Sequence, residues 1–97
     1  MSAITAAPAR TEEEAIAYGW KVFRAAQGAD WPQEHAAKIY PAFTRLSTEL
    51  EMHGRLADDE WAREAAPDTR ATHAQAALKR AADLLWLLER YCGGVPS

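Results

Sequence analysis

The residues best suited to hold a metal ion or to act as a nucleophile are three histidines and one cysteine: His35, His53, His73 and Cys92. Imidazole and thiolate groups bind Zn²⁺ and related ions, and a site on a helix places two of them three or four residues apart. No two of these residues have that spacing, so we expect no metal. A catalytic thiol also needs an adjacent base, whereas Cys92 continues an apolar pattern typical of a small core residue.

Carboxylates could act as acid–base pairs, and here they occur in clusters. The clusters are Glu12–Glu14, Glu49 with Glu51, and Asp58–Glu60. Their positions at predicted helix starts and on solvated helix faces account for them without catalysis. The serines offer no nucleophile either, because Ser2 and Ser97 lie near the chain ends and Ser47 lies mid-helix. We therefore expect no enzymatic activity and no cofactor.

The tryptophans suggest protein binding instead, since Trp and Arg dominate the energy of many interfaces. Trp86 lies on the polar face of its predicted helix with Lys79 and Arg90. It is either covered by the first residues or the loop around Trp31, or exposed as an anchor. Trp31 and Trp61 lie beside acidic residues at predicted helix starts. We expect each of them to be either a half-buried lid over an end of the bundle or part of a contact surface. The candidate partner-binding residues are Trp86, Lys79, Arg90, Trp61, Trp31, Asp58, Asp59 and Glu60.

A helical scaffold should position these side chains. The chain has 22 alanines but only two valines and three isoleucines, and alanine is the best helix former. Apolar periodicity predicts helices over 12–27, about 32–53 and 69–92, with a short one over 59–66. Thr11 to Glu14 reads as a capping box. Gly28, Gly54 and Gly93 should end the three long helices, and Pro41 kinks or breaks the second.

The predicted buried faces follow three- and four-residue spacing. They comprise Ile16, Gly19, Trp20, Phe23 and Ala26; then Ala36, Ile39, Phe43, Leu46, Leu50 and His53; then Ala71, Ala74, Leu78, Ala81, Leu85, Leu88 and Cys92. The expected fold is all-α, a small antiparallel bundle of three long helices and one short helix. Residues 1–10 are predicted to be a flexible arm, 11–93 a single domain and 94–97 a tail.

Charge and hydropathy restrict the partners. The net charge is −3 and no basic stripe is visible in the sequence, so a nucleic-acid partner is not expected. A helix-turn-helix is opposed by the turn at 67–69, which lacks glycine, and by the few cations after it. The longest apolar run, 84–88, is too short to span a membrane. A single cysteine and the absence of a leader pattern favour the cytoplasm.

By elimination, the leading hypothesis is a small non-enzymatic module that binds and regulates or inhibits a larger protein or protein complex. High alanine and arginine with little lysine is typical of GC-rich bacteria and their phages, where anti-CRISPR proteins and antitoxins are small inhibitors of this kind. The alternative is a self-associating scaffold, a homodimer through the helix over 69–92, because residues 84–88 are apolar all round. A third hypothesis is a ligand-binding bundle with His53 and Tyr40 lining an internal cavity.

Overall fold

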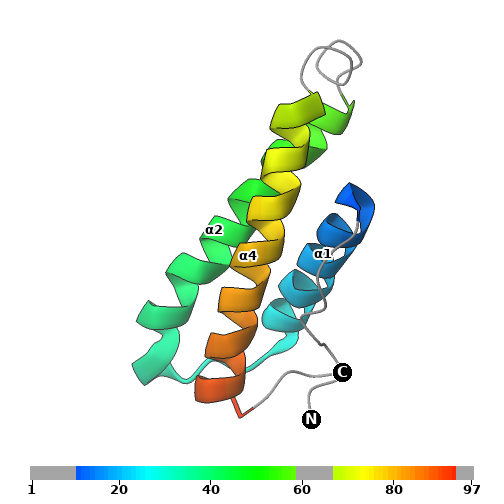
Figure 1. Cartoon of the computed structure of the whole chain (residues 1–97). Helices are drawn as coiled ribbons and strands as arrows, with labels where there is room; N and C mark the ends of the chain where they lie inside the picture. Colours follow the sequence, from blue (N-terminus) through cyan, green and yellow to red (C-terminus); the bar gives the residue numbers. More distant parts are fainter. Residues whose placement is uncertain (1–10, 59–66, 94–97) are drawn as a thin grey trace.

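The computed structural model describes residues 11–58 and 67–93, and within them every regular element is a helix. The helices are α1 (Glu12–Gly28), α2 (Gln33–Asp58) and α4 (Pro67–Tyr91), shown in Figure 1. The prediction of an all-α chain with three long helices is confirmed. The short helix expected over 59–66, the arm over 1–10 and the tail over 94–97 lie outside the described residues.

The ends of α1 and α4 depend on local chemistry. The hydroxyl of Thr11 accepts a hydrogen bond from the backbone N–H of Glu14 at 3.0 Å, as the capping box predicts. Gly93 follows α4 with φ of +71°, the left-handed conformation expected of a terminating glycine. The prediction for Gly28 was wrong, because it is the last residue of α1. The extended Ala29 caps the helix by donating its N–H to the Ala26 carbonyl instead.

Helix α2 runs without a break through both residues that were expected to interrupt it. Pro41 lies inside the helix on its exposed side, where the ring displaces no packed neighbour. Gly54 was expected to end the helix, but α2 continues to Asp58. The last turns carry an exposed Arg55–Glu51 pair, with N···O of 2.6 Å, and lie beside the start of α4 in Figure 1. Tertiary packing thus offsets the weak helix preference of glycine.

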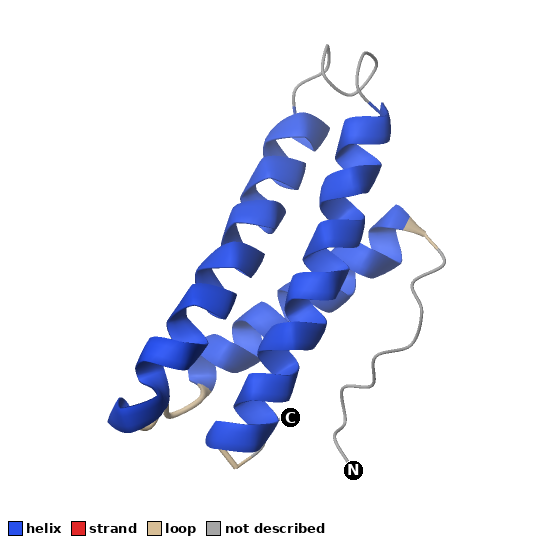
Figure 2. Ribbon diagram, turned by 60° about the vertical axis from the view of Figure 1, so that its left-hand side comes forward, coloured by secondary structure: helices blue, strands red, loops and turns tan. Residues whose placement is uncertain are grey.

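The three helices form a bundle in which α4 packs against both of the others. Helix α2 runs antiparallel to α1 and α4, and Figure 2 shows α1 inclined to the other two. Helices α1 and α2 contact each other much less than either contacts α4. No helix in the described part of the chain combines the length and the apolar character that a membrane crossing requires.

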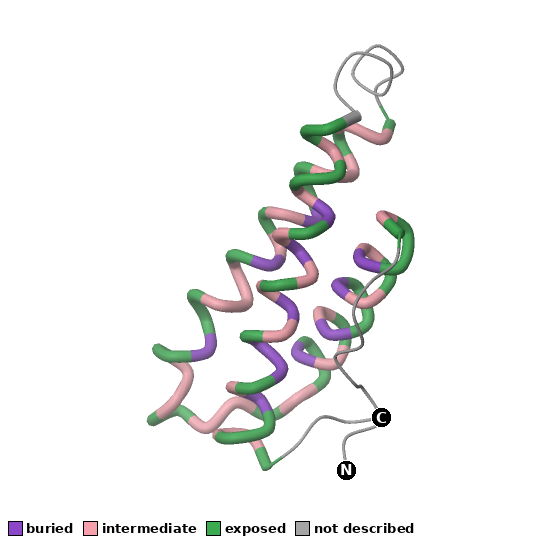
Figure 3. The backbone as a smooth tube through the Cα atoms, viewed as in Figure 1, coloured by how far each residue is buried: buried purple, intermediate pink, exposed green. Residues whose placement is uncertain are grey.

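The core follows one stripe on each helix, seen as the buried segments in Figure 3. Its buried apolar residues are Ala15, Val22, Ala26, Ile39, Leu46, Leu50, Ala74, Ala77, Ala81, Leu84, Leu85 and Leu88. Because α4 faces two neighbours, Leu84, Leu85 and Leu88 are all buried within a single copy. These three leucines of the apolar run that suggested self-association therefore need no second copy to cover them, whereas Trp86 of the same run is exposed.

Two predictions about the core were wrong. Trp20 is 39% exposed, because small residues such as Ala15 and Gly19 form the stripe that α1 turns to the bundle, and Val22 continues it. These small side chains allow a close approach, while Trp20 lies at the edge of the stripe and packs edge-on against Phe23. Ala71 was also expected to be buried but is exposed in the first turns of α4.

Candidate functional site

Trp86 projects from the outward face of α4, and no described segment covers it. Its side chain is 57% exposed, on the side of the helix opposite the buried stripe. The guanidinium carbon of Arg90 lies 5.5 Å from the centre of the Trp86 ring, and Lys79 is two turns earlier on the same exposed face. The loop around Trp31 therefore does not cover Trp86, whereas the other cover considered, the first residues of the chain, lies outside the described residues.

Trp31 is a half-buried lid at the α1–α2 connection. Its indole N–H donates to the Ala26 carbonyl at 3.0 Å, and its ring packs edge-on against Phe43 with centroids 5.3 Å apart. Asp58 is exposed at the last residue of α2, at the end of the bundle opposite Trp86. Trp61, Asp59 and Glu60 lie outside the described residues. Among the candidates within the described residues, Trp86, Lys79 and Arg90 share the outward face of α4, and Trp31 and Asp58 lie apart from it.

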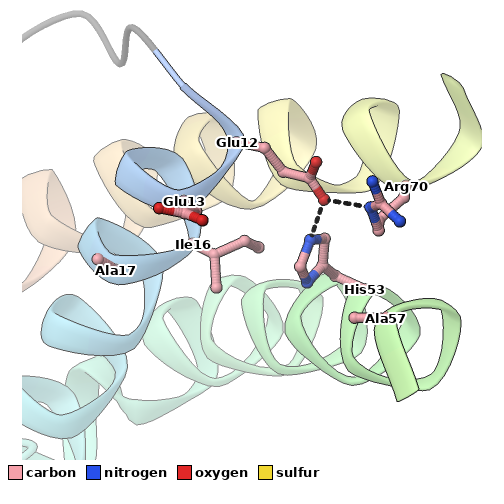
Figure 4. Close-up of a pocket in the computed structure, with 7 residues that line it drawn as sticks. All are labelled: Glu12, Glu13, Ile16, Ala17, His53, Ala57 and Arg70. Carbon is pink, nitrogen blue, oxygen red and sulfur yellow. Dashed lines mark hydrogen bonds and ion pairs between the residues drawn. The ribbon is translucent and has the colours of Figure 1, made fainter. Parts of the chain in front are cut away.

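A polar cluster that was not predicted joins all three helices (Figure 4). Glu12, the first residue of α1, extends its carboxylate between His53 of α2 and Arg70 of α4. The Oε1 atom of Glu12 is 2.6 Å from Nε2 of His53 and 2.7 Å from Nε of Arg70. One carboxylate thus ties the start of α1 to the end of α2 and the start of α4.

The environment of Glu12 favours its ionised form. Burial raises the pKa of the carboxyl group, but hydrogen bonds from His53 and Arg70 and their positive charges outweigh this, and the pKa lies below its ordinary value. A second carboxylate–imidazole pair lies on the neighbouring turns, where Nδ1 of His73 is 2.7 Å from Oε2 of Glu49. His53, which was expected on the buried face of the second helix, is thus half-buried and hydrogen-bonded to a carboxylate.

An open cleft of about 450 Å³ lies beside this cluster. It is lined by Glu12, Glu13, Ile16, Ala17, His53, Ala57 and Arg70. A carboxylate-bound imidazole is the arrangement a general base uses, but this lining contains no hydroxyl or thiol for it to activate. Tyr40 is 60% exposed and does not line this cleft, so His53 and Tyr40 do not share it. The geometry therefore fits a clasp between helices.

The remaining candidates for chemistry are isolated from this cluster. Cys92 follows α4 at the other end of the bundle, and burial raises the pKa of its thiol, which favours the unreactive protonated form. Within 11–58 and 67–93, no group of three or more histidine, cysteine or acidic side chains is placed to hold a metal ion.

Comparison with known proteins gave no relationship from which a function could be carried over. No family model matches the chain, and neither the curated proteins nor the solved structures compared with it include a match.

Proposed function

We propose that this chain is a small protein-binding module that regulates or inhibits a larger partner through the outward face of α4. The observation that carries the proposal is the exposure of Trp86 beside Arg90 and Lys79. A tryptophan on a solvated helix face adds nothing to the core, yet it is among the residues most often found at the centre of interfaces. Within this proposal, the small size and the alanine- and arginine-rich composition support an inhibitor of the anti-CRISPR or antitoxin kind.

The energy available from this one side chain is substantial. A tryptophan buries roughly 150–250 Å² when fully covered, and 57% of the Trp86 surface is still exposed. Covering that remainder, about 110 Å², contributes roughly 3 kcal/mol at about 25 cal/mol per Å². That equals about a hundredfold in affinity. Arg90 already lies over the ring, so part of the contact is preorganised.

The test compares Trp86→Ala with Tyr40→Ala, a matched removal of an exposed aromatic ring on the outer side of α2. Both variants should keep their stability within about 0.5 kcal/mol by thermal unfolding, because neither ring is in the core. Affinity capture from host lysate, with mass measured by light scattering, should show a stoichiometric partner with the wild type and Tyr40→Ala. The same partner should be lost with Trp86→Ala.

Three results would contradict the proposal. Equal capture by all three proteins would show that Trp86 is not part of the contact. A stability loss of about 3 kcal/mol in Trp86→Ala would mark the residue as core. A wild-type dimer that captures nothing and becomes monomeric in Trp86→Ala would favour self-association through α4 instead.

A further inference from the structure

Charged residues are segregated along the bundle. Because α2 runs opposite to α1 and α4, the start of α1, the end of α2 and the start of α4 share one half (Figure 1). That half is acidic, with Glu12, Glu13, Glu14, Glu49, Glu51, Asp58 and Asp68 against Arg55 and Arg70. The other half is basic, with Lys21, Arg24, Lys38, Arg45, Lys79, Arg80 and Arg90 against Asp30, Glu34, Asp83 and Glu89.

The two halves also differ in how their charges are satisfied. In the acidic half, Glu12, Glu49 and Glu51 are paired with histidine or arginine side chains. In the basic half, no lysine or arginine forms an ion pair in the described part of the chain. Instead, cations of this half lie over aromatic rings. The contacts are Arg24 on Trp20, Lys38 on Tyr91, and Arg90 on both Trp86 and Tyr91.

Two contacts between α2 and α4 define one side of their interface, and helical spacing places further cations along that side. The Lys38 ammonium lies 4.9 Å from the centre of the Tyr91 ring, and Glu49 bonds to His73 at 2.7 Å. Between these contacts, Arg45 is two turns after Lys38 and one turn before Glu49, so it projects from the same side of α2.

The corresponding position on α4 is also an arginine. Arg80 is two turns after His73, so it projects toward the same side of the interface as that residue. Arg45 is exposed and Arg80 half-buried. Three acids lie in the neighbouring turns. Glu34 is 3.6 Å from His35, Glu49 is paired with His73, and Asp83 is exposed. We call Lys38, Arg45, Arg80 and Arg90 the basic edge.

The basic edge is continuous with the Trp86 surface through Arg90. The guanidinium carbon of Arg90 lies 5.5 Å from the Trp86 ring centre and 5.7 Å from the Tyr91 ring centre. The pKa of the Tyr91 hydroxyl lies below its ordinary value, because Arg90 donates a hydrogen bond to it and because Lys38 and Arg90 are positively charged. A partner that covers Trp86 therefore meets unpaired cations beside it.

We propose that the basic edge binds carboxylate side chains of a short acidic segment of the partner protein. This inference rests on the protein-binding function proposed above. Arginine presents its N–H groups in a planar fork that matches a carboxylate in a bidentate way, which makes an Arg45–Arg80 pair well suited to aspartate or glutamate. Like charges on facing helices repel, so an anionic partner also removes a repulsion that the free protein carries.

The short length of the basic edge and the acidic residues beyond it favour an acidic protein segment over a nucleic acid as the partner. Lys38 and Arg45 are seven residues apart, about 10 Å along the helix, and the next charge on that side of α2 is Glu49. A nucleic-acid strand of about 4–16 nucleotides would continue into the acidic half. The ring of Tyr91, on which a base would stack, is already in contact with the two cations Lys38 and Arg90.

The direct test uses a fluorescein-labelled peptide of alternating glutamate and leucine. The peptide is about eight residues long, which is enough to span the two turns of α2 between Lys38 and Arg45. A glutamine–leucine peptide and a labelled single-stranded oligonucleotide serve as comparison probes. Fluorescence anisotropy is measured with the wild type, with Arg45→Gln/Arg80→Gln, and with Lys21→Gln/Arg24→Gln. The last variant removes the same charge from α1 and is the matched control, and circular dichroism checks that both variants fold.

The glutamate peptide should bind the wild type and weaken as salt rises, because the contact is electrostatic and largely exposed. Binding should fall about tenfold in Arg45→Gln/Arg80→Gln, which corresponds to about 1.4 kcal/mol, and less than twofold in the control. Absence of peptide binding, an equal loss in both variants, or tighter binding of the oligonucleotide would each overturn the proposal.

Lysate capture separates this inference from the proposed function. If Trp86→Ala loses the partner while Arg45→Gln/Arg80→Gln keeps it, the protein-binding function stands and the acidic-segment inference is wrong. If only the arginine variant loses the partner, the basic edge stands and Trp86 is not the anchor. Retention of the partner by both variants would contradict both proposals.

Discussion

Replacing Glu12 by Gln should destabilise the protein by weakening the clasp among the three helices. Oε1 of Glu12 is bonded to His53 and Arg70, which lie on α2 and α4. Glutamine keeps the size of the side chain and removes the charge that both partners contact. Glu13→Gln is the matched control, because Glu13 occupies the same first turn but is exposed.

The expected size follows from the two bonds and their burial. A hydrogen bond to a charged group contributes about 1.5–3 kcal/mol and a neutral one about half as much. The three side chains are only 14–28% exposed, so solvent screens the charges incompletely. Losing the charge should therefore cost roughly 1 kcal/mol per bond, about 2 kcal/mol in total. The control loses only the helix-dipole contribution, about 0.3–1 kcal/mol.

The effect should depend on pH in a defined direction. The pKa of Glu12 in the folded protein lies below its ordinary value of 4.5, so folding favours the ionised form. The stabilisation is fully present above the pKa of the unfolded chain and disappears as pH falls through the folded pKa. The difference between wild type and Glu12→Gln should thus be largest near neutral pH and should shrink below pH 4.5.

Thermal unfolding followed by far-ultraviolet circular dichroism measures this effect. For a domain of this length, about 2 kcal/mol lowers Tm by roughly 8–16 °C, and Glu13→Gln should lower it by only a few degrees. The reasoning is refuted if Glu12→Gln loses no more stability than Glu13→Gln. It is also refuted if the difference from wild type stays constant from neutral pH to acid.

Further predictions use the same unfolding measurement. Gly54→Ala should stabilise the protein by about 0.5–1 kcal/mol, since the helix gains propensity and an added Cβ meets nothing within 4 Å. Gly19→Ala should instead destabilise it by about 1 kcal/mol, because its Cβ would lie 3.0 Å from the buried Cδ2 of Leu50; equal effects of the two substitutions would contradict this packing. Tyr18→Phe should be neutral or slightly stabilising, because the buried hydroxyl has no hydrogen-bond partner in the described structure, and a loss above about 1 kcal/mol would reveal one. Thr11→Ala should cost about 1 kcal/mol through loss of the α1 cap, and an unchanged Tm would show that the cap is dispensable.

The helices were largely predictable because their signals are local. Thr11 and Gly93 begin and end helices through contacts within a few residues, and the three- and four-residue spacing of Ile39, Leu46 and Leu50 identifies a buried face. The errors at Gly28, Gly54 and Trp20 have two origins. In each case packing against another helix or an alternative cap decided the outcome.

The sites were less predictable than the helices. The pattern around Trp86 correctly placed it on a polar face, because helical periodicity alone decides which residues lie opposite the core. The sequence analysis explained the cluster at Glu12 by a helix start and the acids at Glu49 and Glu51 by a solvated helix face, and it missed their histidine partners. It also found no basic stripe, because the cations of the basic edge come from two helices and are far apart in the sequence.

The sequence by itself determined the helical class, most helix ends and the outward position of Trp86, since these depend on interactions within one or two turns. Tertiary structure alone decided that Glu12 meets His53 and Arg70, which are 41 and 58 residues away. It also decided that Arg45 and Arg80 lie along one interface. The physical reason is that one helix can turn its face toward several neighbours, and packing between the helices, as where Gly19 lies close to Leu50 and Ala77, selects the neighbour and the register.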